Sequence, residues 1–374
     1  MAEKTGRKSA QSASKTGDGP VGTGTEPLDE KDRKKARKKA EKAQRKAAEA
    51  AEAAVRANLE AEAAVETAAA KASKAARAAA AAPGVAIDPE LVPTVVSPGE
   101  FATALRVGPG FRLADVDTSS TPAFTGDKAQ AELVMRAYEP EIADLQERLY
   151  AASRDGDGAS VLLVVQGMDT SGKGGIMRHV VGLLDPQGTS IHAFKKPTAE
   201  ERRHPFLWRI RKALPEPGII GVFDRSHYED VLVARVDDLV PASTWRRRYG
   251  QIRTFEESLV DSGTTLVKVM LDIGHAEQKA RLAARLERPD KYWKFNPGDI
   301  DVRHKWDAYA EAYEEALVKT STDEAPWYVV PADHKWYARL AVQQLLLGAL
   351  RRIDPQWPPA DFDVEEQKAR LADS

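Results

Sequence analysis

The chain has 374 residues, enough for one large domain or two ordinary ones, and its formal net charge of −2 predicts no particular partner. It contains no cysteine, which excludes disulfides, thiolate metal sites and thiol catalysis and fits a reducing cytoplasm. No apolar run is long enough to cross a membrane, and the N-terminus lacks the apolar core of a signal peptide. We therefore expect a cytoplasmic protein that is not embedded in a membrane.

The N-terminal part of the chain has low complexity. Residues 1–26 are rich in Gly, Ser, Thr and Lys and are predicted to be disordered, whereas residues 28–82 are almost wholly Ala, Lys, Glu and Arg and favour a helix. Residues 31–46 are strongly basic. We favour a solvated tail here, and the alternative is an arm that binds a polyanion such as nucleic acid or polyphosphate.

Periodic patterns begin beyond this part. Residues 85–127 contain five prolines and are expected to form an ordered, extended arm. Residues 128–152 carry apolar side chains at helical spacing. Five apolar residues, 161–165, then predict a buried strand in a parallel sheet.

A glycine-rich turn, GMDTSGK, follows this strand directly. From Gly167 through Gly172 to Lys173 it has the G-x-x-x-x-G-K spacing of a phosphate-binding loop, and residues 176–184 read as the start of a helix. The glycines allow successive N–H groups to turn inward, the helix start adds partial positive charge, and Lys173 supplies an ammonium for the outer phosphates. The alternative is a chance glycine turn, which the flanking strand and helix and a downstream acidic motif disfavour.

The loop departs from the usual motif at one position. Gly174 stands where a Ser or Thr hydroxyl normally holds Mg²⁺. Asp169 lies inside the loop, and a carboxylate there would repel a phosphate unless a cation sat between them. The sequence therefore predicts Mg²⁺, with Asp169 as a ligand.

A second acidic motif follows another strand. Residues 190–194 and 218–223 are predicted strands, and the second ends at Asp224, followed by Arg225. Ligands gather at the carboxyl ends of parallel strands, so we expect Asp224 to hold Mg²⁺ and Arg225 to meet a phosphate. The alternative for Asp224 is an ordinary helix cap. His227 is interpreted as a packing or hydrogen-bonding residue without a catalytic role.

The remaining elements alternate between helices and strands. Helices are predicted at residues 200–214, 245–262, 275–286, 302–319 and 336–353, and strands at 264–273 and 327–331. The first of these helices is dense in Arg and Lys, and we expect it to face something anionic. Arg281, Arg285 and Arg288 are spaced to share one helix face, and a basic segment follows. This suits a lid that closes over phosphates, with a solvated basic helix as the alternative.

Four segments carry a resemblance to a known family. GMDTSGKGG, FDRSHYED, RLERPDKYWKFNPGD and PWYVVPADHKWYARLAV, with the flanks LRVGPGF and LQERLYA, resemble the family 2 polyphosphate kinases over residues 101–358. The resemblance implies phosphoryl transfer between inorganic polyphosphate and nucleotides with Mg²⁺, on an α/β, three-layer P-loop kinase fold similar to thymidylate kinase. We assign residues 1–84 to an extension, 85–358 to the catalytic domain and 359–374 to a C-terminal tail.

The resemblance assigns roles to residues across the domain. It implies that Asp169 and Asp224 hold Mg²⁺ and that Lys173 and Arg225 stabilise the transferred phosphoryl group. Arg285 and Arg288 would close over that group from a helical lid. Lys195 and Arg203 would guide the polyphosphate chain, which needs a basic track. The candidate substrate-binding residues are Gly167, Gly172, Gly174, Gly175, Lys195, Arg203 and Glu229.

Two questions stay open at this stage. The segment HYED, residues 227–230, is more similar to members that phosphorylate both mono- and diphosphates, whereas Gly174-Gly175 stands where those members often have Asp-Gly. The rival functions are an ATP-dependent nucleoside monophosphate kinase, which Gly174 disfavours, and a polyanion- or DNA-binding protein. We expect a homo-oligomer, a dimer or tetramer, with no nucleic-acid partner except through the N-terminal arm.

Overall fold

The computed structural model describes residues 31, 96–154 and 158–374. The predicted extension, residues 1–84, lies outside this part of the chain except for Lys31, as does the beginning of the predicted arm. Within the described residues, no helix combines the length and the apolar character needed to cross a membrane.

A five-stranded parallel sheet forms the centre of the fold. Its strands are β1 (Ser160–Gly167), β2 (Thr189–Ala193), β3 (Ile220–Asp224), β4 (Thr264–Asp272) and β5 (Trp327–Pro331). The order across the sheet is β2-β3-β1-β4-β5, so β1 lies between β3 and β4. In this register Val165 of β1 pairs with Asp224 of β3, which brings the ends of the two strands together. All five predicted strands are confirmed, with ends that differ by at most two residues.

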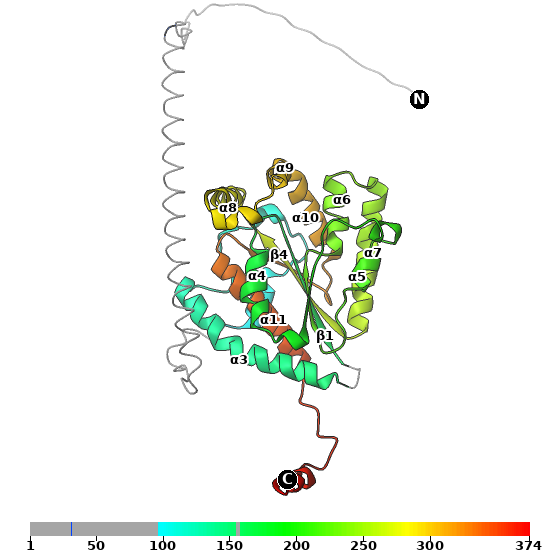
Figure 1. The fold of residues 1–374 in the computed structure, drawn as a ribbon. Helices are drawn as coiled ribbons and strands as arrows, with labels where there is room; N and C mark the ends of the chain where they lie inside the picture. The colour runs from blue at the N-terminus through cyan, green and yellow to red at the C-terminus, as the bar shows by residue number, and fades with distance from the viewer. Residues whose placement is uncertain (1–30, 32–95, 155–157) are drawn as a thin grey trace, which may run out of the picture. The chain divides into compact units, whose positions relative to one another are not determined.

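Helices cover both faces of the sheet. The α-helices of the described residues are α2 (Pro98–Leu105), α3 (Lys128–Ala152), α4 (Lys173–His179), α5 (Trp208–Arg211), α6 (Val233–Val236), α7 (Ala242–Asp261), α8 (His275–Glu287), α9 (Gly298–His304), α10 (Trp306–Thr320), α11 (Lys335–Ile353) and α12 (Val364–Ala372). Figure 1 shows α3, α4 and α11 on one face and α5 and α7 on the other. The predicted three-layer α/β fold is confirmed.

Alternation along β1 explains the two cores. Successive strand residues point to opposite faces, so Val161 and Leu163 join one apolar cluster, whereas Leu162 and Val164 join the other. Both faces are buried, which is why the strand reads as a continuous apolar run. Burial on both faces fixes the position of the loop that follows β1.

Two predicted helices were wrong in detail. The helix expected at residues 200–214 is a single 3₁₀ turn (Glu201–Arg203) and the short α5, because Pro205 holds the preceding His204 in an extended conformation. The helix expected at 302–319 is divided into α9 and α10 by Lys305, whose φ and ψ of −100° and 22° are not helical. The basic density of residues 200–214 therefore does not lie on one helix face.

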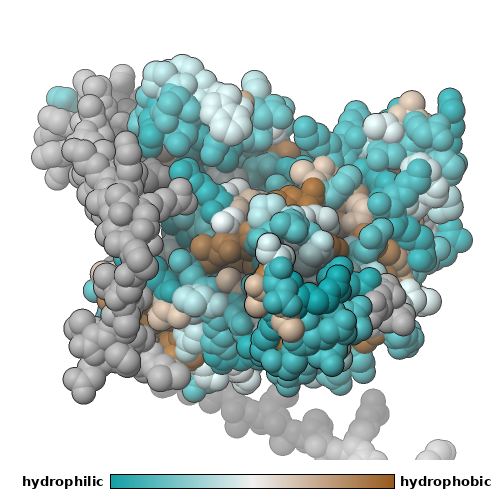
Figure 2. Space-filling model, turned by 60° about the horizontal axis from the view of Figure 1, so that its bottom comes forward, coloured by the Kyte–Doolittle hydropathy of each residue, from teal (hydrophilic) through white to brown (hydrophobic). Residues whose placement is uncertain are grey.

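Both ends of the described catalytic region contain helices that were not predicted. The arm includes α2, which begins with Pro98 at its first turn and buries Phe101 and Leu105 in the core. The C-terminal tail includes α12, which begins after the capping side chain of Asp363 and has no buried residue. Figure 2 shows a largely hydrophilic face with apolar residues gathered near its centre.

Candidate active site

The phosphate loop, residues 167–173, connects β1 to α4. Gly167 has φ of +146°, and a Cβ there would lie 2.7 Å from the carbonyl oxygen of Leu271, so only glycine fits. Gly174 is different, because among the described residues no atom lies within 4 Å of a Cβ built on it. A serine would fit at that position, so packing does not explain the missing hydroxyl.

Opposite charges meet at the ends of β1 and β3. The guanidinium of Arg225 lies 2.9 Å from the carboxylate of Asp169 and 3.8 Å from that of Glu229. Burial opposes the charge on Arg225, but Glu229 and Asp169 outweigh it, and the pKa of Arg225 is raised. Burial raises the pKa of Glu229, although Arg225 and Lys173 act against this shift. The structure thus brings together four of the predicted site residues.

Lys173 folds back onto the loop that carries it. Its ammonium donates to the carbonyl oxygens of Gly167 at 2.7 Å and Met168 at 3.2 Å. Burial lowers the pKa of Lys173, while the carboxylates of Asp169 and Asp224 act against this shift. These contacts hold the charged end of Lys173 within the loop.

The carboxylates at the site fit a magnesium ion. Oδ1 of Asp224 is buried and has no hydrogen-bond partner within the described part of the chain, which marks an acceptor that is not satisfied by protein groups. The structure contains no group of three or more His, Asp or Glu side chains arranged for a metal among the described residues. Mg²⁺ normally takes one or two carboxylates, with substrate phosphates and water as its other ligands, so Asp169 and Asp224 suit it.

Arg281 was expected to share a helix face with Arg285 and Arg288, but it packs against the phosphate loop instead. It is buried, and its guanidinium donates to main-chain carbonyl oxygens of the phosphate loop and of the segment after β5. The helix predicted at residues 275–286 is present as α8, but the spacing of its arginines did not show which side of the helix packs against the loop.

The two remaining lid arginines contact groups within the predicted lid. Arg285 donates to the carbonyl oxygen of Lys294 at 2.9 Å and lies 3.3 Å from the carboxylate of Asp299. Arg288 lies 3.0 Å from the carboxylate of Asp290. In Figure 1, α8 and α9 lie at the top of the view, above α4. Closure of these residues over a phosphate stays a prediction.

Lys195 and Arg203 follow β2, the edge strand beside β3. The carbonyl oxygen of Lys195 accepts a bond from Arg209 at 2.8 Å, and Arg203 lies 3.2 Å from Glu200 with 76% of its side chain exposed. Both are exposed residues, and among the described residues no hydrogen bond joins either of them to the phosphate loop. A polyphosphate track at this edge stays a prediction.

A buried polar cluster lies behind the acidic motif. His227 is fully buried, and its ring nitrogen lies 3.2 Å from Glu256, which confirms the interpretation of His227 as a hydrogen-bonding residue. Glu256 also accepts bonds from the ammonium of Lys268 at 2.6 Å and the hydroxyl of Tyr228 at 2.8 Å. Burial opposes the charge on Glu256, but Lys268 and His227 outweigh it and lower the pKa of Glu256.

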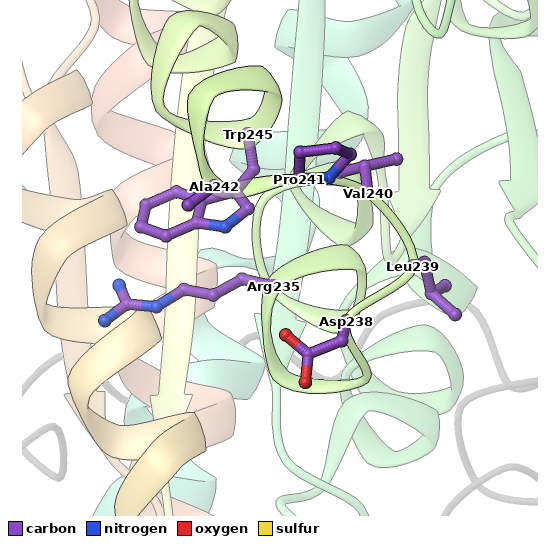
Figure 3. Close-up of a pocket in the computed structure, with 7 residues that line it drawn as sticks. All are labelled: Arg235, Asp238, Leu239, Val240, Pro241, Ala242 and Trp245. Carbon is purple, nitrogen blue, oxygen red and sulfur yellow. The ribbon is translucent and has the colours of Figure 1, made fainter.

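A separate pocket of about 550 Å³ lies at the start of α7. Figure 3 shows Arg235 with its guanidinium below the indole ring of Trp245. The guanidinium also lies 2.5 Å from Glu315, so its charge is already balanced. None of the predicted site residues lines this pocket, whose walls are Arg235, Asp238, Leu239, Val240, Pro241, Ala242 and Trp245.

Sequence reasoning did not predict how two further pairs of residues contact or adjoin the site. Gln278 and Arg281 are buried polar residues three positions apart on α8, and polar residues at core spacing are the signal that could have found them. Tyr309 and Tyr313 of α10 are buried in the core, and they also adjoin the charged groups of the site. Burial and then the carboxylate of Glu229 raise the pKa of Tyr313 well above its ordinary value.

The fold and the site define a class of protein. A glycine-rich loop after the central strand, a lysine within the loop and an aspartate at the end of the neighbouring strand are the parts of a P-loop phosphotransferase. Such enzymes act mainly by placing phosphate groups and neutralising their charge.

Comparison with known proteins gives the family. A model described as Polyphosphate kinase 2 (PPK2) matches residues 126–358, and the chain belongs to this family. An AMP/ADP-polyphosphate phosphotransferase of Meiothermus ruber is 43% identical over 256 residues, 68% of this chain and 94% of that protein. An ADP-polyphosphate phosphotransferase of Rhodopseudomonas palustris is 40% identical over 68% of this chain and 91% of that protein. The crystal structure of polyphosphate kinase 2 from Arthrobacter aurescens TC1 is 53% identical, with a TM-score of 0.72 over 74% of this chain and 97% of that one.

Proposed function

We propose that this chain transfers phosphoryl groups between inorganic polyphosphate and nucleotides, with AMP, ADP and GDP as candidate acceptors and Mg²⁺ as the cofactor. The observation that carries the proposal is the unsatisfied carboxylate of Asp224 beside a phosphate loop that has Gly174 in place of the metal-binding hydroxyl. The names of the relatives agree with this activity.

The residues of the site divide the work of the reaction. Asp169 and Asp224 would hold Mg²⁺, which supplies positive charge between phosphate groups when it is bound. Lys173 and Arg225 place cationic donors beside the loop, where they would stabilise negative charge on the transferred phosphoryl group in the transition state. Glu229 lies 3.8 Å from Nη1 of Arg225, whose Nη2 donates to Asp169, so both carboxylates would favour this placement of the guanidinium.

The remaining basic residues serve the longer substrate. Arg285 and Arg288 of the predicted lid would add cationic contacts when the lid closes, which also excludes water from the site. Lys195 and Arg203 would contact the polyphosphate chain beyond the reacting end. A chain of repeated negative charges is bound by a row of cations rather than by a shaped pocket.

The decisive experiment supplies polyphosphate as the sole phosphoryl donor. The purified protein is incubated with polyphosphate and Mg²⁺ and with AMP, ADP, GMP or GDP in separate reactions, and the nucleotide products are separated by chromatography. We expect diphosphates or triphosphates to form from polyphosphate, and none to form when EDTA replaces Mg²⁺. Transfer from ATP to monophosphates with none from polyphosphate would instead support the ATP-dependent kinase.

A homo-oligomer, a dimer or tetramer, is also part of the proposal. Sedimentation of the full-length chain measures its mass directly, and a monomer at assay concentration would contradict it.

A further inference from the structure

Two buried polar side chains of α8 donate hydrogen bonds to the main chain of the phosphate loop. Gln278 is fully buried, and its amide nitrogen donates to the carbonyl oxygen of Asp169 at 3.1 Å. Arg281 donates through Nη1 to the carbonyl oxygens of Thr170 at 2.9 Å and Ser171 at 3.3 Å. Three successive carbonyls of the loop are therefore held by one helix.

These hydrogen bonds determine where the N–H groups of the loop point. In a trans peptide plane the C=O group and the N–H of the next residue point in opposite directions. With the carbonyls of Asp169 and Ser171 held toward α8, the N–H groups of Thr170 and Gly172 are directed away from the helix. Thr170 also has φ of +64°, a left-handed conformation that is costly for a β-branched residue and persists only where its surroundings enforce it.

The guanidinium of Arg281 uses all five of its N–H groups. Besides the loop, it donates through Nη2 to the carbonyl oxygens of Ala332 at 2.7 Å and Asp333 at 2.8 Å, and through Nε to Glu277 at 2.7 Å. Arg281 thus joins the loop to the segment after β5. A lysine has one point of charge and cannot reproduce this fork of donors.

Gln278 extends the same connection to the other side of the predicted lid. Its side-chain oxygen accepts a bond from Arg303 of α9 at 3.1 Å, and Arg303 also donates to the carbonyl oxygen of His275 at 2.6 Å. Both nitrogen and oxygen of this amide are therefore engaged, and the amide links α9 to the loop through α8.

We propose that Gln278 and Arg281 are positioning residues that hold the phosphate loop in the conformation that presents its N–H groups to phosphate. They act through the loop's carbonyls and touch no substrate. The inference rests on the proposed function only in that a phosphate group binds at the loop. Because α8 also carries Arg285, the helix that holds the loop is the helix that would begin the lid.

The test uses three variants of the full chain. Gln278→Leu removes one loop contact with little change in volume, and Arg281→Lys keeps the charge but removes the fork. Lys279→Met is the matched control, because Lys279 is an exposed residue of the same helix. Each protein is titrated with inorganic tripolyphosphate and Mg²⁺ by calorimetry. Amide hydrogen exchange is followed in peptides that cover the loop and β4.

We expect the tripolyphosphate Kd to rise about tenfold in Gln278→Leu and about a hundredfold in Arg281→Lys, as the loss of one and of several hydrogen bonds implies. Loop amides should exchange faster in both variants while β4 amides and the control stay unchanged. Restoring the donor with Gln278→His should recover part of the affinity lost in Gln278→Leu.

Other outcomes overturn the inference. If Gln278→Leu binds tripolyphosphate and exchanges its loop amides as the wild type does, the inference is wrong. It is also wrong if amides of the loop and of β4 both exchange faster, because that result indicates a purely structural role. If Arg281→Lys fails to fold, the binding and exchange measurements on Gln278→Leu alone decide whether the positioning role is correct. If the wild type binds tripolyphosphate but transfers nothing to nucleotides, the proposed function fails while these binding and exchange results still judge the positioning role.

Discussion

At the scale of single residues, the site keeps its charges close to balance. Asp169 and Glu229 flank Arg225, and Lys173 lies against the carbonyls of its own loop. Asp224 stands apart, because its buried Oδ1 has no partner among the described residues. A buried carboxylate oxygen without a partner is costly unless a ligand satisfies it, so Asp224 gives the sharpest test of the metal.

Asp224→Asn should lower turnover by about a hundredfold or more, because it removes a preorganised charge that the reaction uses. Its melting temperature should stay within a few degrees of the wild type, since the substitution keeps the shape of the side chain and Oδ1 makes no hydrogen bond to the described residues. Turnover and thermal unfolding are measured at several Mg²⁺ concentrations. Near-normal turnover at saturating Mg²⁺ would show that Asp224 is not a ligand.

Asp272, at the end of β4, gives a prediction about pH. Burial, and then the charge of Asp333, raise the pKa of Asp272 from 3.8 to about 7. Below pH 4 the group is protonated in both folded and unfolded chains. Between pH 4 and pH 7 the unfolded chain loses its proton while the folded one keeps it, so stability falls as pH rises. The full loss, reached above pH 7, is roughly 4 kcal/mol.

Asp272→Asn should therefore melt at a higher temperature than the wild type at pH 8. The difference should shrink as pH falls and vanish near pH 4, where the wild-type carboxyl is neutral as well. Thermal unfolding of both proteins at intervals of one pH unit checks this. Melting curves that run parallel at every pH would show that Asp272 is not buried in its neutral form.

At the scale of elements, the predicted lid is the part whose role most needs a test. Arg285 is held by Lys294 and Asp299, groups of the lid itself. We expect Arg285→Ala to lower turnover by about a hundredfold, because a cation directed at a developing charge is lost. The melting temperature should change little, since partly exposed ion pairs contribute only ~0–1 kcal/mol.

Glu287→Gln, an exposed substitution near the end of the same helix, is the control for Arg285→Ala and should keep normal turnover. A large fall in melting temperature with unchanged turnover in Arg285→Ala would show that Arg285 serves the structure rather than the reaction.

Strands β1, β3, β4 and β5 were predictable because each is a short, mostly apolar run that is buried and ends at a glycine, proline or acidic residue. The edge strand β2 is largely exposed and gave a weaker pattern. The helix at residues 128–152 was predictable from its long, regular spacing, and its observed bounds agree. The single helix predicted at residues 200–214 was wrong because the prediction rested on the density of Arg and Lys and ignored the break at Pro205. The division at Lys305 was not predictable because no proline or glycine lies at this point in the sequence.

The site was predictable where chemistry lies in a local motif, as in the phosphate loop and at Asp224. Contacts between distant residues were not predictable. Asp169 and Arg225 are 56 positions apart, and their 2.9 Å contact depends on β1 and β3 being neighbours in the sheet. Arg281 shows the same limit within one helix, because its side chain turns toward carbonyls that carry no sequence signal.

At the scale of the whole molecule, the N-terminal extension gives a further prediction. Its composition cannot bury a core, so deletion of residues 1–82 should leave melting temperature and activity on short polyphosphate unchanged. Long chains are expected to contact the catalytic site and residues 31–46 together, which raises apparent affinity through effective concentration.

The truncated protein should therefore show a higher KM for long polyphosphate only, and the difference should close as salt is raised. Steady-state rates of both proteins with short and long chains, at low and high salt, measure this. Equal KM values on long chains at low salt would leave the extension without a role in binding polyphosphate.

The contacts from α8 to the loop carry a consequence for sequence change. Gln278 and Arg281 bond to main-chain oxygens, which every amino acid provides, so they place no demand on the side chains of Asp169, Thr170 or Ser171. Substitutions of side chains inside the loop can then alter its chemistry while the contacts from α8 maintain its main-chain conformation. In a chimera between relatives, a foreign loop should be tolerated where this helix is retained, whereas a foreign helix that lacks the two polar residues should not be.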